Sequence, residues 1–195
     1  QFLHAWGRPG EAQPVDVAVG PNELYVCDIE DNEIEVWNRA DGSYLRSIGG
    51  LGTEPGKFFM PTYVTLDQEG NLLVTDTANY RVQKLTPQGE PLLTFGGHGN
   101  RLGDFAWPKG LDVDGRGRIY VADTRFANVQ IFSPEGQLLL FFGGPGKDRG
   151  YLDLPGGISL HPWPSIPWLE ERLIKDFEPE FLALVVNQHA PPMVN

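Results

Sequence analysis

The residues that could act in catalysis or bind a metal ion are few and scattered. The four histidines, His4, His98, His161 and His189, have no spacing that would bring them to a shared metal ion. Cys27 is the only cysteine, which excludes an internal disulfide and a multi-cysteine zinc site. We therefore predict no catalytic residue, no bound metal ion and no cofactor.

Three aspartates that recur at a nearly constant interval are candidate catalytic carboxylates. Asp28, Asp76 and Asp123 each end a short apolar run. A catalytic carboxylate is usually unique, whereas a residue that is present in every repeat generally serves the repeat. An aspartate at this place can accept hydrogen bonds from the backbone amides of the following turn. We therefore expect all three to be structural.

The aspartates belong to a repeat that runs through most of the chain. Four prolines are spaced by 47 residues (61−14, 108−61 and 155−108): Pro14, Pro61, Pro108 and Pro155. Glycine pairs keep the same phase at Gly49-Gly50, Gly96-Gly97 and Gly143-Gly144. A fixed period of this length indicates a repeat architecture.

Each repeat contains four short segments with β propensity. The first strand is expected at 16–20, 63–67 and 110–114, the second at 24–28, 72–76 and 119–123, the third at 34–37, 82–85 and 129–132, and the fourth at 44–48, 91–95 and 138–142. Glycine turns such as Asp41-Gly42 connect the last two strands. Four short antiparallel strands per repeat predict an all-β fold made of propeller blades.

The motifs resemble those of the NHL-repeat β-propeller family. The third repeat carries Gly103-x-Phe105-x-x-Pro108, and the second contains the fullest match, from Asp76 to Gln83. The resemblance extends over most of the chain and implies a ring that is often six-bladed. In bacteria it also implies an extracytoplasmic location, periplasmic or secreted.

The repeat predicts the organisation of the chain. Residues 1–13 would end a preceding blade, 14–60, 61–107 and 108–154 would be whole blades, and 155–195 would be a partial blade. In this last part the first strand is expected to stop at Leu160, and the second to run from Leu182 to Asn187.

An insertion at about 161–180 separates those two strands. Ile166, Leu169, Leu173 and Phe177 recur at helical spacing before Pro179. The segment therefore predicts one amphipathic helix, which either covers the propeller edge or docks a partner.

Two kinds of ring remain open. The strand around Trp6 could complete the last blade and close a small four-bladed ring. Alternatively, the sequence is a segment of a longer chain that forms a larger ring, as the often six-bladed NHL relatives suggest. We favour the larger ring because both ends of the sequence fall inside blades.

The charge and hydropathy of the chain bear on its partners. Its formal net charge of −11 makes nucleic acid an unfavourable partner. The longest apolar run, from Phe181 to Val186, is far shorter than the roughly 20 residues of a membrane span. A secretion signal, if there is one, would lie upstream of Gln1 or have been removed.

Residues that differ between blades are the better candidates for recognition, because the scaffold does not require them. Lys109 stands where the other repeats have Val15 and Thr62, and Arg125 stands where they have Glu30 and Ala78. The candidate contact surface consists of Tyr63, Arg81, Trp107, Lys109 and Arg125. The alternative is that these are solvated loop residues around a packed tryptophan.

These observations predict a non-catalytic module that binds a protein partner or acts as a scaffold in a larger assembly. A propeller lyase or hydrolase, with its site completed by further blades, is the alternative. RNA binding, which occurs in some NHL domains, is disfavoured by the negative charge.

Overall fold

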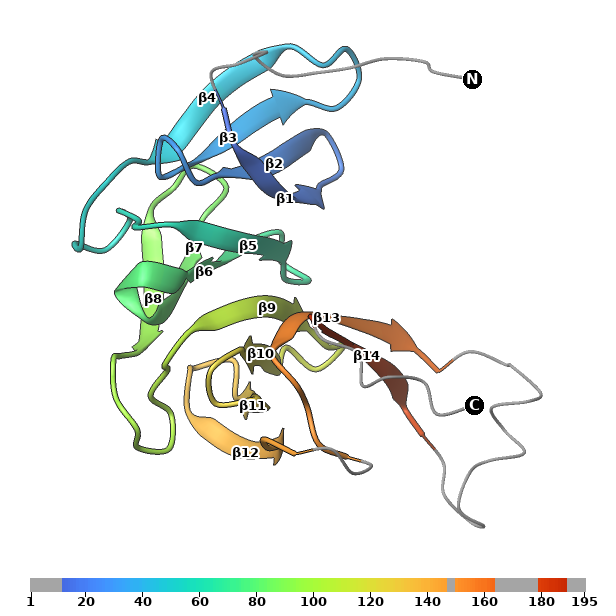
Figure 1. Ribbon diagram of the computed structural model, residues 1–195. Coiled ribbons are helices and arrows are strands. Elements are labelled where there is room, and N and C mark those ends of the chain that lie inside the picture. The colour runs from blue at the N-terminus through green and yellow to red at the C-terminus, as the bar shows by residue number, and fades with distance from the viewer. Residues whose placement is uncertain (1–11, 147–149, 164–178, 189–195) are drawn as a thin grey trace.

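The computed structural model describes residues 12–146, 150–163 and 179–188, and these are built almost entirely of β-strands (Figure 1). The first sheet contains β1 (Pro14–Val19), β2 (Glu23–Asp28), β3 (Glu33–Asn38) and β4 (Tyr44–Gly49). The second contains β5 (Pro61–Leu66), β6 (Leu72–Asp76), β7 (Arg81–Leu85) and β8 (Pro91–Gly96), with the 3-10 turn η1 (Thr77–Asn79) after β6. The third contains β9 (Pro108–Val113), β10 (Ile119–Asp123), β11 (Asn128–Phe132) and β12 (Leu138–Gly143). The fourth pairs β13 (Pro155–Pro162) with β14 (Phe181–Asn187).

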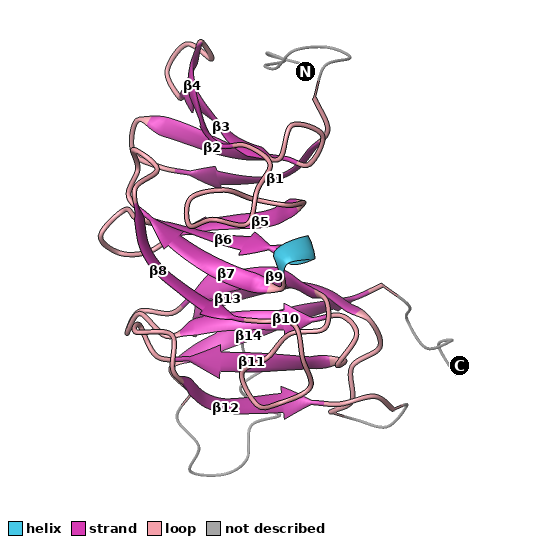
Figure 2. Cartoon of the chain, turned by 90° about the vertical axis from the view of Figure 1, so that its left-hand side faces the viewer, coloured by secondary structure: helices cyan, strands magenta, loops and turns pink. Residues whose placement is uncertain are grey.

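The sheets are arranged as the blades of a β-propeller. Within each sheet the strands follow sequence order and every pair is antiparallel. The first strands of successive sheets, β1, β5, β9 and β13, lie beside one another, and the last strands form the outer edges (Figure 1). Figure 2 shows the sheets stacked face to face along the molecule. The predicted all-β propeller fold is confirmed.

The strands begin and end within two residues of the positions expected from the repeat. The fourth sheet departs from expectation, because β13 continues past Leu160 through Pro162. His161 and Pro162 extend the hairpin by pairing with Leu182 and Phe181 of β14. The predicted helix falls on 164–178, which lie outside the described residues.

A glutamine from the third strand anchors the crossover that enters each of two sheets. The Nε2 of Gln83 donates a hydrogen bond to the carbonyl oxygen of Lys57 (2.7 Å), and its Oε1 accepts one from the amide of Gly56 (2.9 Å). Gln130 holds the next crossover in the same way at the carbonyl of Asp104 (2.9 Å). These bonds fix the loops that lead to the first strands.

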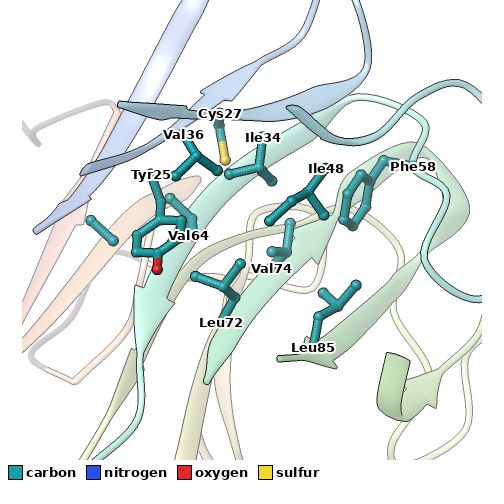
Figure 3. Close-up of a cluster of buried hydrophobic side chains, with 11 residues drawn as sticks. Tyr25, Cys27, Ile34, Val36, Ile48, Phe58, Val64, Leu72, Val74 and Leu85 are labelled. Atoms are coloured by element: carbon teal, nitrogen blue, oxygen red, sulfur yellow. The ribbon is translucent and has the colours of Figure 1, made fainter. Parts of the chain in front are cut away.

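Apolar side chains fill the space between each pair of adjacent sheets. Successive residues of a strand point to opposite faces, so Leu72 and Val74 pack toward the first sheet and Leu73 packs toward the third. Figure 3 shows the side chains of the first two sheets converging on the cluster between them. The core is therefore a series of interfaces between sheets.

Candidate functional site

The aspartate at the end of each second strand binds backbone amides. Asp123 accepts hydrogen bonds from the amides of Ala106 (2.7 Å), Trp107 (3.1 Å), Arg125 (3.0 Å) and Phe126 (2.9 Å). It thereby joins the incoming crossover to the turn that follows β10. The carboxylate is fully buried and is engaged in holding the backbone, which agrees with the structural role expected for it.

The other two aspartates have equivalent contacts. Asp76 accepts hydrogen bonds from the amide of Phe59 (2.7 Å) and from the guanidinium of Arg81 (2.7 Å). Asp28 accepts them from the amides of Gln13 (3.1 Å) and Glu30 (2.9 Å). Each aspartate therefore holds together the end of its sheet at which the first strand begins.

This framework brings Trp107 and Arg125 together. Pro108 of β9 pairs with Asp123 of β10, so the residues that flank this pair lie at the same end of the sheet. The amide of Thr124 donates a hydrogen bond to the carbonyl of Trp107 (3.0 Å). The guanidinium carbon of Arg125 then lies 5.3 Å from the centroid of the Trp107 ring, which is a cation–π contact.

Lys109 is the second residue of β9, and Trp107 directly precedes this strand. We refer to Trp107, Lys109 and Arg125 as the β9 surface. Lys109 and Trp107 are half-buried and Arg125 is exposed. Arg125 follows the end of β10, so the three residues lie at the same end of the third sheet. Lys109 and Arg125 were selected because they differ from their counterparts in the other repeats.

The cations of the β9 surface have no acceptor in the part of the chain that the structure describes. The side chains of Lys109 and Arg125, and of Arg101 in the preceding crossover, make no hydrogen bond or ion pair there. The other described lysines and arginines are bound to carbonyl or carboxylate oxygens: Arg39, Arg46, Lys57, Arg81, Lys84, Arg116 and Arg118. Positive charge that is free to meet a ligand therefore gathers around one sheet.

Arg81 is the expected site residue whose side chain is engaged internally. Its guanidinium binds Asp76 (2.7 Å) and the carbonyls of Thr53 (2.6 Å), Glu54 (3.1 Å) and Lys57 (2.8 Å). The side chain is only 12% exposed. We therefore assign Arg81 to the framework and leave it out of the β9 surface.

Tyr63 lies on β5 and is half-buried in the cluster between the second and third sheets. Burial, assisted by the charge of Asp16, raises the pKa of the Tyr63 hydroxyl. The hydroxyl oxygen lies 3.3 Å from the place that a Cβ would occupy at Gly157, on the fourth sheet. It therefore faces the inner strand of the fourth sheet.

The remaining reactive side chains are dispersed. Cys27 is fully buried, and burial raises the pKa of its thiol well above the usual value. His98 packs on Tyr80, and His161 shares a hydrogen bond with Ser159 (3.1 Å).

Within 12–146, 150–163 and 179–188, no three His, Cys, Asp or Glu side chains lie close enough together to bind one metal ion. His4 and His189 lie outside these ranges.

A cavity of about 550 Å³ lies at the opposite end of the inner strands. The ends of β5, β9 and β13 line it with Leu66, Val113 and Leu160. Its charged groups are paired, since the guanidinium of Arg118 binds Asp114 (2.5 Å). Sequence reasoning missed this cavity because its walls come from three sheets.

The pKa of the Asp114 carboxyl reflects the hydrogen bonds that this side chain accepts. Burial by itself raises the pKa of the Asp114 carboxyl. Hydrogen bonds from the amides of Arg116 and Arg118 and from the Arg118 guanidinium outweigh that effect, and the pKa is lowered. The carboxylate is held ionised by its own turn.

No helix among the described residues is long and apolar enough to cross a membrane.

Comparisons with known proteins support the fold. No protein-family model matches the chain. A stretch of 46 residues, 24% of this chain and 7% of the other protein, is 37% identical to human E3 ubiquitin-protein ligase TRIM32. Virginiamycin B lyase from Staphylococcus aureus superposes with a TM-score of 0.58 at 19% identity, covering 76% of this chain and 46% of the lyase. The structure of U3-55K gives 0.60 at 18% identity, covering 77% of this chain and 43% of U3-55K.

The chain thus spans less than half the length of these two structures and a small part of TRIM32. At these identities the likeness to the solved structures shows the propeller fold alone.

Proposed function

We propose that the chain is part of a protein-binding propeller of NHL type, in which the β9 surface contacts an acidic segment of a partner protein. The observation that carries the proposal is the set of uncommitted cations on that surface. Lys109 and Arg125 have no acceptor among the described residues, although the chain as a whole has a net charge of −11.

The residue types of the β9 surface and their restricted conformations support recognition of a partner protein. Arg and Trp are enriched among the residues that contribute most to protein interfaces. The backbone of Arg125 is fixed by Asp123 and its guanidinium rests on Trp107, so little conformational freedom remains to be lost on binding. The surface is therefore preorganised.

The chemistry of the partner follows from the two cations. A guanidinium and an ammonium without internal acceptors are suited to carboxylate groups, and the arginine can bind one through two parallel hydrogen bonds. The net charge of the chain is −11, so nucleic acid is an unfavourable ligand for these two cations. A glutamate- or aspartate-rich peptide segment is the ligand class that we propose.

The family assignment rests on the framework that surrounds the surface. The NHL resemblance is drawn from motif residues such as Asp76, Gln83 and Gln130, and in the structure these side chains bind the backbone of the crossovers. A lyase or hydrolase activity has the likeness of fold as its only support, so we do not propose it.

Binding of a short polyglutamate peptide, measured by fluorescence anisotropy at low salt, tests the proposal. We expect Lys109→Glu and Arg125→Glu each to weaken binding about tenfold, because each replaces an attractive charge by a repulsive one. Raising the salt concentration should weaken binding to the unmodified chain as well.

The matched control is Arg116→Glu, which makes the same charge change at an exposed position beyond the other end of β9. We expect the control to bind the peptide nearly as well as the unmodified chain. Equal losses in all three variants would show that net charge alone governs binding, and the assignment of the β9 surface would then be wrong.

A further inference from the structure

Phe59, in the crossover that enters the second sheet, is an exposed aromatic residue that the repeat does not require. It is 45% exposed, and its ring contacts no other aromatic ring or cation among the described residues. The same position, two residues before the repeating proline, holds Ala106 in the third repeat and Asp153 in the fourth. Since the fold is built without an aromatic residue there, the Phe59 ring is available to a partner.

The backbone that carries this ring is held firmly. The amide of Phe59 donates a hydrogen bond to Asp76 (2.7 Å), and its carbonyl oxygen accepts one from the amide of Ala78 (3.0 Å). The amide of the next residue, Met60, donates to the side chain of Asn32 (2.8 Å). A ligand that contacts Phe59 and Met60 therefore meets a crossover that needs little ordering.

A hydrogen bond between sheets connects this crossover with the β9 surface. Ala78, which binds the carbonyl of Phe59, directly follows Thr77. The Thr77 hydroxyl donates to the carbonyl oxygen of Pro108 (2.8 Å), and Pro108 directly precedes Lys109. Figure 1 shows η1, which contains Thr77 and Ala78, at the side of the sheets on which β5 and β9 begin. Phe59 therefore lies at the same end of the sheets as the β9 surface, one sheet away.

The turn after the second strand has a different character in each of the first three sheets. Its second residue after the buried aspartate is Glu30 in the first sheet, Ala78 in the second and Arg125 in the third. Glu30 and the neighbouring Asp31 are exposed, as is Arg125. With Phe59 beside Ala78, this end of the sheets changes from acidic to apolar to basic.

We propose that the acidic segment bound by the β9 surface carries a large apolar side chain that packs on Phe59 and Met60. The inference rests on the proposed function and extends its surface by one sheet. Glu30 and Asp31 repel carboxylates from the first sheet, so the acidic residues of the segment lie on Lys109 and Arg125. Stacked sheets are about 10 Å apart, which an extended peptide spans in about three residues. The apolar residue is therefore expected about three positions from the acidic ones.

Fluorescence anisotropy with two labelled peptides tests the proposal. Both begin with a glutamate run and continue with a serine spacer, and they end in either serine or leucine about three residues beyond the last glutamate. We expect the leucine to strengthen binding about fivefold, because it is partly removed from water on Phe59.

Phe59→Ala should remove the gain from leucine and leave binding of the serine peptide unchanged. Alanine is the residue that the third repeat has at this position, and the hydrogen bonds of Phe59 use backbone atoms, so we expect the variant to fold. Leu102→Ala is the control, because Leu102 is 75% exposed in the next crossover and should keep the gain. Circular dichroism checks that both variants are folded.

The same titrations distinguish failure of the inference from failure of the proposed function. Arg125→Glu should weaken binding of both peptides, whereas Phe59→Ala affects the leucine peptide alone. If the serine peptide binds through Lys109 and Arg125 but leucine adds nothing, or if Phe59→Ala keeps the gain, the inference is wrong and the proposed function stands. If neither peptide binds, or if both ignore the charge reversals, the proposed function fails and the inference fails with it.

The acidic first sheet provides a second readout. Further glutamates placed beyond the leucine should weaken binding, because they would lie near Glu30 and Asp31, and Glu30→Gln should reduce this loss. Equal or tighter binding of the extended peptide would contradict the placement of its apolar residue on the second sheet.

Discussion

The hydroxyl of Thr77 donates a hydrogen bond of 2.8 Å to the carbonyl oxygen of Pro108, and this bond ties the second sheet to the inner strand of the third. Thr124 makes the same bond to Pro155 of the fourth sheet. Both threonines directly follow the buried aspartate that ends the second strand. In these two repeats the aspartate thus secures its own sheet and the threonine secures the next.

We expect Thr77→Val to lower the free energy of unfolding by about 1–3 kcal/mol, because the variant keeps the shape but leaves the buried carbonyl of Pro108 without its donor. Denaturant unfolding measures the loss. Thr53→Val is the control, since the Thr53 side chain is exposed and makes no hydrogen bond in the described structure. Equal stability of the two variants would disprove the role of the hydroxyl.

At Gly110 the backbones of the third and fourth sheets approach closely. A Cβ at this position would lie 2.6 Å from the Cα of Gly157 and 2.6 Å from the amide nitrogen of Ile158. Since these are backbone atoms, we expect Gly110→Ala to destabilise the chain by about 1–3 kcal/mol, as overpacking generally does. Gly97→Ala, where a Cβ meets no atom within 4 Å, should leave the melting temperature nearly unchanged.

Asp114 should make stability depend on pH in the acid range. The pKa of its carboxyl is lowered from 3.8 in the folded chain, because its hydrogen bonds outweigh the effect of burial. A carboxylate with a lowered pKa stabilises the fold above its unfolded pKa, and this contribution is lost as the pH falls through the folded pKa. We therefore expect Asp114→Asn to be less stable than the unmodified chain at neutral pH.

The difference in unfolding free energy should shrink as the pH falls from 3.8 through the lowered pKa of the folded chain, because below that pKa both side chains are neutral. Asp153→Asn serves as the control, because Asp153 is exposed and its carboxylate makes no hydrogen bond in the described structure. A constant difference between Asp114→Asn and the unmodified chain across the pH series would contradict the prediction.

Arg81 should matter for stability. Its loss would leave the buried Asp76 without its ion-pair partner, so we expect Arg81→Ala to lower the free energy of unfolding by about 3 kcal/mol. Arg101→Ala removes the same kind of side chain from a site where it makes no hydrogen bond or ion pair among the described residues, and it should change stability little. If both variants unfolded alike, the framework role of Arg81 would be wrong.

The sequence alone was sufficient to predict the blades, because strand length, glycine turns and proline spacing are local properties that recur in each repeat. It also placed Asp76 and Asp123 correctly as structural, since their recurrence argued against a unique chemical role. Lys109 and Arg125 could be selected as candidates for recognition because, unlike the aspartates, they differ from their counterparts in the other repeats.

The tertiary structure decided which of the selected residues have their charges engaged. Arg81 and Arg125 both differ from their counterparts in the other repeats, yet carbonyl oxygens of a crossover bind the Arg81 guanidinium, whereas the Arg125 guanidinium lies on the Trp107 ring. The place of Phe59 beside the β9 surface also depends on how the sheets stack, because the hydrogen bond from Thr77 to Pro108 joins their two sheets. Burial and charge pairing arise from contacts between distant segments, and a repeat pattern does not specify them.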